Sequence, residues 1–435
     1  MNPLLAFLIL FPVAMLPIRS DGVVVFLYAK LLTLTAFVLL FVLRGQYRAI
    51  SLRRSDLWIG VLVVLASVSD AVNGVPLLAL GGRLEGPVTL VLLFAWYLMA
   101  RASFESDPNL VVTFRQFWPA YVFIPLVIAL LQYFSPASVL ATLLSGDAAD
   151  AQPGSTFGNR GSLASFLMVM IPIGLASIRG SAKPRDRRWL AVLLLLVGLV
   201  FAVAQTRAAW LGLGLAGLIG LIWFRPSLSK LKPLFWPAVI LVAGFGIGLA
   251  LPNPDRTRHF ESPDSGRVLL WTIAVRAIES RPLLGWGTGG FKRAFDRYAD
   301  WQNDPKVRAY LIPKIRDPRL SYTLEQDTAG IYVVTKGSLG PVDFFNKQQI
   351  VNDKAHNEYL DMAVQYGLVY PAAWLAWILI IIWRSRSRYL EVGVSVVALL
   401  IFNVFWMNSV TVLPIVMILV ALLSARRDIR STNPV

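Results

Sequence analysis

Three residues combine a type and a position that suit phosphate chemistry: Arg207, Arg267 and His356. Arg207 lies at a tight turn between two apolar segments, and Arg267 opens a segment with apolar residues at helical spacing. A guanidinium binds two phosphate oxygens at once, and the free N–H groups of a helix N-terminus attract the same anion. His356 precedes an apolar helix, whose positive dipole end favours a neutral imidazole. A neutral base beside an arginine-bound diphosphate suits a group transfer in which an acceptor hydroxyl loses its proton.

Each of the three also has an ordinary structural explanation. Arg207 follows the end of one helix, where a cation is favourable by about 0.3–1 kcal/mol, and we weigh this equally with a phosphate contact. The helix that Arg267 opens, with Asp264 and Ser265 as expected caps, is more often a simple interfacial anchor. A lone loop histidine is usually solvated, which is our interpretation of His259, whereas the helix terminus separates His356 from that class.

The residues after His356 are expected to assist it. Glu358, Tyr359 and Asp361 follow within about one helical turn and can orient the imidazole or the acceptor. We predict that Glu358 and Tyr359 contact substrate. The run Gly285–Gly290 lacks the spacing of a nucleotide loop and is interpreted as a flexible turn that lets the backbone approach a ligand or the membrane.

Three further basic residues are predicted to contact substrate: Arg83 and Arg160 in short loops, and Lys30 inside an apolar segment. A lysine deep in a membrane span costs about 2.5–3.5 kcal/mol, so it normally faces a cavity or a partner. For Lys30, and for Asp70 near the end of another span, structural pairing and ligand contact both remain open.

Composition indicates a membrane protein. The 435 residues are 56% hydrophobic and only 15% charged, whereas soluble domains average about 25% charged residues. A spanning helix needs about 20 apolar residues, and by that measure we predict twelve spans. They are Leu4–Ile18, Gly22–Leu43, Leu57–Val72, Gly86–Ala100, Phe117–Phe134, Ser162–Ile178, Trp189–Gln205, Ala208–Phe224, Leu234–Leu251, Asn357–Trp383, Tyr389–Trp406 and Ser409–Leu423.

Basic residues gather in alternate loops, which predicts that both termini are cytoplasmic. These are Arg44, Arg48, Arg53 and Arg54 after the second span, Arg179, Lys183, Arg185, Arg187 and Arg188 after the sixth, Arg225, Lys230 and Lys232 after the eighth, Arg384, Arg386 and Arg388 after the tenth, and Arg426, Arg427 and Arg430 after the twelfth. The polar stretch 252–354 then lies outside. Topology accounts for much of the net charge of +16, so we predict no nucleic-acid partner.

The predicted fold is therefore an all-α polytopic membrane protein of about twelve transmembrane helices. One long extracytoplasmic loop contains amphipathic helices. We divide the chain into spans 1–9 (residues 1–251), a loop or lid with the catalytic residues (252–356), and spans 10–12 with a short cytoplasmic tail (357–435). The first span is interpreted as a retained helix. With two histidines and no cysteine, we predict neither a metal site nor a cofactor.

Taken together, the motifs resemble the O-antigen ligase family, which includes O-antigen polymerases and protein O-oligosaccharyltransferases. The resemblance rests on Gln205–Ala209, on Arg267 with Trp271 and then Pro282–Gly287, and on His356–Leu360 leading to Tyr366–Leu368. It covers roughly residues 156–368. One departure is Gln205-Thr206, where the family often has a serine before the arginine.

The resemblance implies transfer of a glycan from undecaprenyl diphosphate to an acceptor hydroxyl, without metal and with inversion. It occurs on the periplasmic face of the bacterial cytoplasmic (inner) membrane. Arg207 and Arg267 would hold the diphosphate, and His356 would be the general base. For a ligase the acceptor is lipid A–core, and membrane lipids surround the enzyme. A ligase is our first interpretation. The resemblance implies no metal, and undecaprenyl diphosphate is a good leaving group whose charge two arginines can stabilise in place of one.

Other functions remain open. A polymerase would use the same donor and a second lipid-linked glycan as acceptor. A protein O-oligosaccharyltransferase is expected to carry an extended soluble region beyond Arg430. A polytopic transporter predicts related halves and charges along a central pathway, whereas here the polar residues concentrate in one late loop.

Overall fold

The computed structural model describes residues 2–15, 22–80, 84–107, 109–135, 153–180, 184–226, 228–252, 266–312, 320–327, 330–339, 342–349, 352–385 and 389–426. The chain forms two compact units. The first contains Met1–Val64, Arg83–Asn253 and Ala373–Val435, and the second contains Leu65–Gly82 and Pro254–Ala372. The second unit thus joins residues 65–82 and 357–372 to most of the predicted loop.

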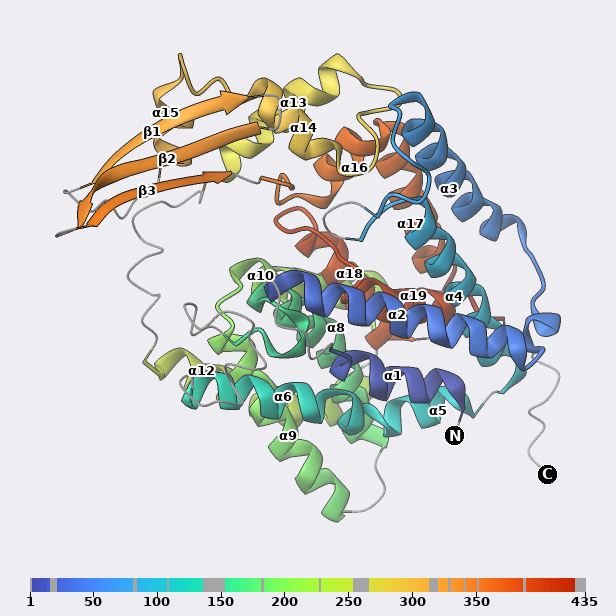
Figure 1. Ribbon diagram of the computed structural model, residues 1–435. Helices are drawn as coiled ribbons and strands as arrows, with labels where there is room; N and C mark the ends of the chain where they lie inside the picture. Colours follow the sequence, from blue (N-terminus) through green and yellow to red (C-terminus); the bar gives the residue numbers. More distant parts are fainter. Residues whose placement is uncertain are drawn as a thin grey trace, which may run out of the picture. The chain divides into compact units, whose positions relative to one another are not determined.

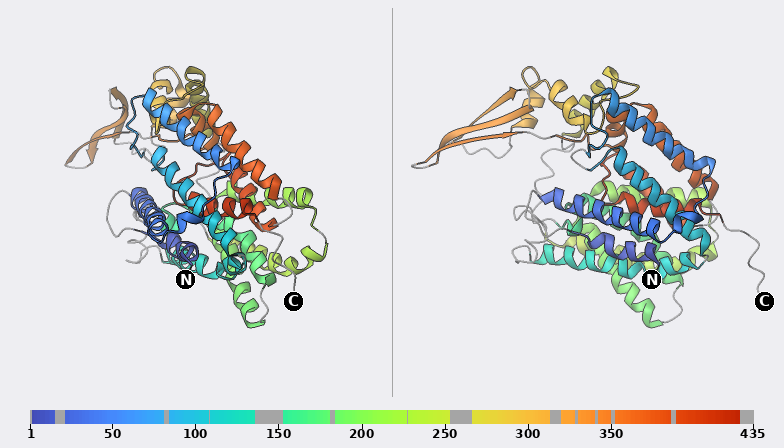
Figure 2. Two further views of the ribbon diagram at one scale, coloured as in Figure 1. Left: turned by 90° about the vertical axis from the view of Figure 1, so that its right-hand side faces the viewer. Right: turned by 45° about the vertical axis from the view of Figure 1, so that its right-hand side comes forward.

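The first unit is helical (Figure 1). Its elements are α1 (Pro3–Val13), α2 (Gly22–Leu43), η1 (Gln46–Ala49), α4 (Pro87–Ser106), α5 (Leu110–Gln116), α6 (Trp118–Phe134), η2 (Ser155–Phe157), α8 (Arg160–Gly180), α9 (Pro184–Val203), α10 (Arg207–Phe224), α11 (Leu228–Leu231), η3 (Lys232–Leu234), α12 (Phe235–Ala250), α18 (Leu390–Phe402) and α19 (Leu413–Ser424). Helices α3 (Arg54–Val72) and α17 (Val369–Ser385) have residues in both units. Within the first unit α1 contacts both α2 and α6, as can be followed in Figure 2.

Close helix packing in the first unit depends on small residues. Helix α8 contacts α6, α9, α10 and α18, and 89% of its span is buried. Helices α9 and α12 approach so closely that a Cβ on Gly198 would lie 2.2 Å from the Leu241 carbonyl oxygen, and one on Gly244 would lie 2.0 Å from that of Leu195. Small residues let helix backbones approach each other, which is how spanning helices gain packing energy without a hydrophobic driving force.

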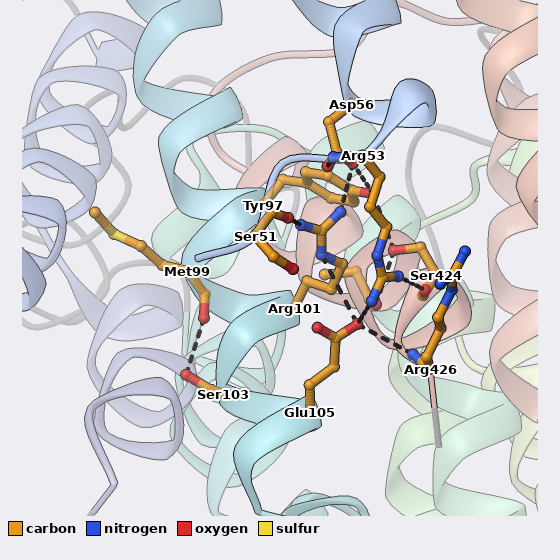
Figure 3. A network of polar contacts seen from close by, with 11 residues as sticks. Ser51, Arg53, Asp56, Tyr97, Met99, Arg101, Ser103, Glu105, Ser424 and Arg426 are labelled. Carbon is orange, nitrogen blue, oxygen red and sulfur yellow. Dashed lines mark hydrogen bonds and ion pairs between the residues drawn. The ribbon is translucent and has the colours of Figure 1, made fainter. Parts of the chain in front are cut away.

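A buried ion pair lies where α3 begins and α4 ends (Figure 3). The guanidinium of Arg101 is 1% exposed and donates to the carboxylate of Asp56, which is fully buried, and to the carbonyl oxygen of Ser51. Tyr97, one turn earlier on α4, donates its hydroxyl to Ser424 Oγ over 2.9 Å. Because a buried charge needs a partner, these contacts fix the ends of α3, α4 and α19 together.

The same network extends into the neighbouring loops. Arg53 pairs with Glu105 and donates to the carbonyl oxygen of Ser424 over 2.9 Å, as Figure 3 shows. Arg115, after the fourth predicted span, pairs with Glu391, near the start of the eleventh. The loops after the second, fourth and twelfth predicted spans and the start of the eleventh therefore contact one another, as segments at one side of a membrane must.

Alternate loops gather elsewhere in the unit. Thr156 donates its hydroxyl to the carbonyl oxygen of Pro12, so the loop after the fifth predicted span contacts the end of α1, within the first predicted span. Thr206, between the seventh and eighth, donates to the carbonyl oxygen of Arg160 over 3.5 Å. The pairing agrees with the alternation expected of a polytopic chain. Which side is cytoplasmic stays a prediction.

Within the part of the chain that the structure describes, six helical stretches are long and apolar enough to cross a membrane: Phe26–Leu43, Arg54–Val72, Pro87–Ser106, Leu110–Phe134, Arg160–Ile178 and Lys232–Ala250. Five shorter apolar helices lie at other predicted spans: Pro3–Val13, Arg207–Trp223, Val369–Ser385, Leu390–Phe402 and Leu413–Ser424. The chain is therefore described as a helical membrane protein, and twelve crossings remain a prediction.

The second unit combines helices with a sheet. Its helices are α13 (Arg267–Ser280), α14 (Gly290–Tyr298), α15 (Pro305–Leu311) and α16 (Glu358–Tyr366). Strands β1 (Leu320–Asp327), β2 (Gly330–Leu339) and β3 (Val342–Gln349) form an antiparallel sheet in sequence order, in which Leu324 pairs with Val333 and Val334 with Lys347. Residues of α13, α14, α15, α16 and the sheet share one apolar core.

The structure corrects two predictions. The all-α class is wrong, because β1, β2 and β3 form a sheet within the predicted loop. Its strands contain β-branched and aromatic residues such as Tyr332, Val333, Val334 and Thr335, which fit a pleated surface. The single tenth span Asn357–Trp383 is also wrong. It breaks between α16 and α17 at Gly367, whose φ of 83° ends α16.

Candidate functional site

His356 lies directly before α16, and its backbone is fixed on both sides. Asn357 caps the helix by accepting from the backbone N–H groups of Tyr359 at 3.0 Å and Leu360 at 3.1 Å. Asp361, fully buried, accepts from the N–H of Ala355 over 2.8 Å. His356 itself has a φ of 55°, in the left-handed region that few non-glycine residues adopt. These contacts hold the strained backbone conformation of His356 in place.

Two predicted substrate residues follow on the first turn of α16. Glu358 is buried and Tyr359 is half-buried. Burial raises the pKa of Tyr359, and the neighbouring Glu358 carboxylate raises it further, so the phenol stays protonated and can donate a hydrogen bond. Sequence reasoning correctly placed these residues within a turn of His356. The contact from Asp361 to Ala355 was not predicted, although an acidic residue in the first turn of a helix is a signal for it.

Arg267 begins α13, as predicted, while the expected caps Asp264 and Ser265 lie outside the described residues. The helix follows Gly266, whose φ is 73° and whose added Cβ would lie 2.3 Å from the Tyr310 ring. Arg267 is half-buried, and burial lowers the pKa of its guanidinium. Arginine nevertheless stays protonated in proteins, so a positive charge with reduced hydration lies at a helix N-terminus. Both features favour an anion beside it.

Helices α13 and α16 contact each other. The turn after α13 receives the end of α16, because the N–H of Leu368 donates to the carbonyl oxygen of Pro282 over 2.9 Å. The second unit therefore brings Arg267, His356, Glu358 and Tyr359 onto two neighbouring helices.

Arg207 belongs to the first unit, where it begins α10 and is exposed. The turn before it is tight: Gln205 has a φ of 49°, and the Thr206 hydroxyl donates to the carbonyl oxygen of Ala204 over 3.1 Å. The contact of Thr206 with Arg160 brings the N-termini of α8 and α10 together. Arg160 and Arg207 thus begin neighbouring helices, an arrangement that suits an anionic group.

The structure describes only one of the other two predicted substrate residues, Lys30 and Arg83. Lys30 is fully buried, and its ammonium donates to the carbonyl oxygens of Phe11 at 2.6 Å, Pro12 at 2.9 Å and Ala14 at 3.1 Å. It also lies over the Phe157 ring. Three acceptors match the three hydrogens of the ammonium. These contacts are those expected if Lys30 has a structural role, which is one of the two roles left open by the sequence. Arg83, like His259, lies outside the described residues.

The glycine run after α13 packs closely against the end of α16. The N–H groups of Trp286 and Gly287 donate to the carbonyl oxygens of Val364 and Gln365, each over 2.8 Å. Gly285 has a φ of 62°, and a Cβ there would lie 2.5 Å from the carbonyl oxygens of Val364 and Gln365. The close backbone approach expected of this run is therefore made to α16.

Residues 189–310 match the family model described as O-antigen ligase. The chain carries an O-antigen ligase family domain. The matched stretch contains Arg207 and Arg267, and His356 follows it. This match supports a likeness to membrane glycosyltransferases of the O-antigen ligase and polymerase type. No curated protein and no solved structure gives a significant match.

No metal-binding group stands out in this O-antigen ligase family domain or in the rest of the described chain. Among the described residues, no cluster of three or more His, Cys, Asp or Glu side chains could hold an ion. The predicted independence from metals needs a measurement of activity.

Proposed function

We propose that this protein transfers a glycan from undecaprenyl diphosphate to an acceptor hydroxyl, and that its acceptor is lipid A–core, as in an O-antigen ligase. The observation that supports this best is the position of Arg207 and Arg267. Both lie in the stretch matched by the family model, and each begins a helix. A guanidinium at a helix N-terminus combines a fixed charge with free N–H groups, which suits the oxygens of a diphosphate.

In the proposed reaction, Arg207 and Arg267 bind the diphosphate and neutralise charge that grows on it as the glycan departs. His356 accepts the proton of the acceptor hydroxyl. That oxygen forms a bond to the anomeric carbon while the bond from that carbon to the diphosphate oxygen breaks. The electron pair leaves with undecaprenyl diphosphate, and attack from the opposite face inverts the anomeric configuration. Arg160, beside Arg207, is proposed to contact the donor as well.

The surroundings of His356 support its role as base. The positive dipole end of α16 disfavours a positive charge on the imidazole ring, so the neutral form that accepts a proton is favoured. Tyr359 keeps its phenolic proton and can donate to a sugar or acceptor oxygen. We propose that Glu358 also contacts substrate.

The proposed location is the bacterial cytoplasmic membrane, with the second unit facing the periplasm. Basic residues lie in the loops after the second, tenth and twelfth predicted spans, and the loops after the second and the twelfth both contact Glu105, after the fourth. Positively charged loops normally face the cytoplasm.

The decisive experiment mixes the purified protein with lipid-linked glycan and lipid A–core, in the presence and absence of a chelator. A joined product formed at similar rates in both supports a metal-independent ligase. A product that grows only from lipid-linked glycan identifies a polymerase instead. Activity that requires added magnesium or manganese rejects charge stabilisation by arginines alone.

A further inference from the structure

Two residues in the last turn of α3 and the residue that follows the helix carry polar side chains that all reach the chain segment after α13. Ser69 donates to the carbonyl oxygens of Leu284 and Gln365, the latter over 2.8 Å. Asn73 donates to the carbonyl oxygen of Gly285 over 3.2 Å. Asp70, fully buried, accepts from both the N–H and the hydroxyl of Thr288. These residues lie in the second unit with the segment that they contact.

Asp70 makes the strongest of these contacts. Its two oxygens accept from Thr288 N at 2.6 Å and Thr288 Oγ1 at 2.8 Å. The Thr288 hydroxyl lies 3.1 Å from the hydroxyl of Tyr366, on the last turn of α16. The guanidinium of Arg293 is attracted to the Asp70 carboxylate. Hydrogen bonds to a charged acceptor are about twice as strong as neutral ones, so Asp70 holds this segment firmly.

The segment Pro282–Gly290, here called the junction turn, joins both helices of the candidate site. Trp286 donates its indole N–H to the carbonyl oxygen of Ala277 on α13 over 3.0 Å and its backbone N–H to that of Val364 on α16 over 2.8 Å. Helix α13 runs from Arg267 to Ser280 and leads directly into the turn. Helix α16 follows His356 and ends against the turn. A residue that fixes the junction turn therefore fixes the relative position of both helices.

We propose that Asp70 is a positioning residue for glycan transfer: through Thr288 and the junction turn it sets the position of Arg267 relative to His356. This rests on the proposed function. Helix α13 has 14 residues and is about 21 Å long. A tilt of about 5° at the junction turn would thus move Arg267 by about 2 Å. A displacement of about 1 Å of a reacting group can lower a rate about 100-fold, so even this tilt is enough to matter.

The kinetic test compares Asp70→Ala, Asp70→Asn and the control Thr272→Ala. The Thr272 hydroxyl donates to Val268 within α13, on its exposed face. Asp70→Ala should lower kcat about 100-fold with a smaller change in the KM for lipid-linked glycan. Asp70→Asn keeps an acceptor for the Thr288 N–H and a donor for its hydroxyl, so it should transfer within about fivefold of the wild type. Transfer by Asp70→Ala at the wild-type rate, or by Asp70→Asn as slowly as by Asp70→Ala, overturns the proposal.

Amide hydrogen exchange supplies a readout that does not depend on activity. Asp70→Ala should speed exchange in peptides covering 285–290 by about 10- to 100-fold, since a hydrogen bond to a charged group is lost, and leave α8 unchanged. Unchanged exchange in 285–290 contradicts the role of Asp70. Should Asp70→Ala fail to fold, Thr288→Val removes only the hydroxyl and should slow transfer about tenfold, and a wild-type rate for it overturns the proposal. A wild-type protein that transfers no glycan would instead refute the proposed function.

Discussion

Substitution of His356 by asparagine is the most direct test of the proposed mechanism. The φ of 55° makes the choice of residue important. Alanine in the left-handed region adds about 1–2 kcal/mol of strain, which would confuse loss of structure with loss of chemistry. Asparagine tolerates this conformation, so the Asn357 cap and the contact from Ala355 to Asp361 should persist in His356→Asn.

The expected loss follows from the role of a general base. Removal of the base should slow the chemical step by about 10²–10⁴-fold. This corresponds to an increase of about 2.7–5.4 kcal/mol in the activation free energy. Donor affinity should change little, because we assign diphosphate binding to Arg207 and Arg267. In the wild type, transfer should fall as the solution pH is lowered and the imidazole becomes protonated, whereas His356→Asn should lose this dependence.

The assay is single-turnover transfer from a prebound lipid-linked glycan, measured beside equilibrium binding of the donor. His259→Ala, which changes the other histidine of the chain, serves as the control and should transfer normally. Weaker donor binding by His356→Asn with an unchanged turnover rate would refute the reasoning. His356 would then be a binding residue, and Glu358 or Asp361 would be the next candidate for the base.

Three further predictions concern charge, topology and packing. Arg207→Lys and Arg267→Lys should each lower transfer about 100-fold in the same assay, because an ammonium cannot bind two phosphate oxygens as a guanidinium does; near-normal rates would make the arginines structural anchors. Single cysteines at Asn303 and Asp186 should label from opposite faces of intact cells, and labelling from one face contradicts the topology. Gly367→Ala should destabilise the folded protein by at least about 1 kcal/mol, measured by thermal unfolding in detergent, since its φ is 83° and a Cβ would lie 1.9 Å from the Leu283 carbonyl oxygen; Gly214→Ala, with open space around it, should be nearly neutral or stabilising.

Hydropathy was sufficient to predict most helices of the first unit, because a span must be long, apolar and bounded by polar loops. It failed at residues 357–383, where Gly367 divides an apolar run without introducing a charge. The sheet was missed for a related reason. Its strands carry many polar residues, so hydropathy does not distinguish them from the polar loop in which they lie.

The candidate site was predicted only in part. Residue type and helix position indicated Arg207, Arg267 and His356, and the structure confirms that Arg207 and Arg267 begin helices. The functions of all three stay predictions. Sequence spacing carries no information on contacts between Asp70 and Thr288, which are 218 residues apart. The left-handed backbone conformation of His356 could not be predicted either, because a histidine residue does not require that conformation.

The network at the ends of α3, α4 and α19 has a consequence for biosynthesis. The ion pair between Asp56 and Arg101 needs only the early part of the chain, and it can form while later helices are still being synthesised. Tyr97 and Arg53 must wait for Ser424, which follows them by 327 and 371 residues. Until α19 has been inserted, a nascent chain can pair Arg53 with Glu105 and Tyr97 with Asp56, but it lacks the contacts of both residues with Ser424. The polar network at the ends of α3 and α4 therefore becomes complete only when α19 joins it.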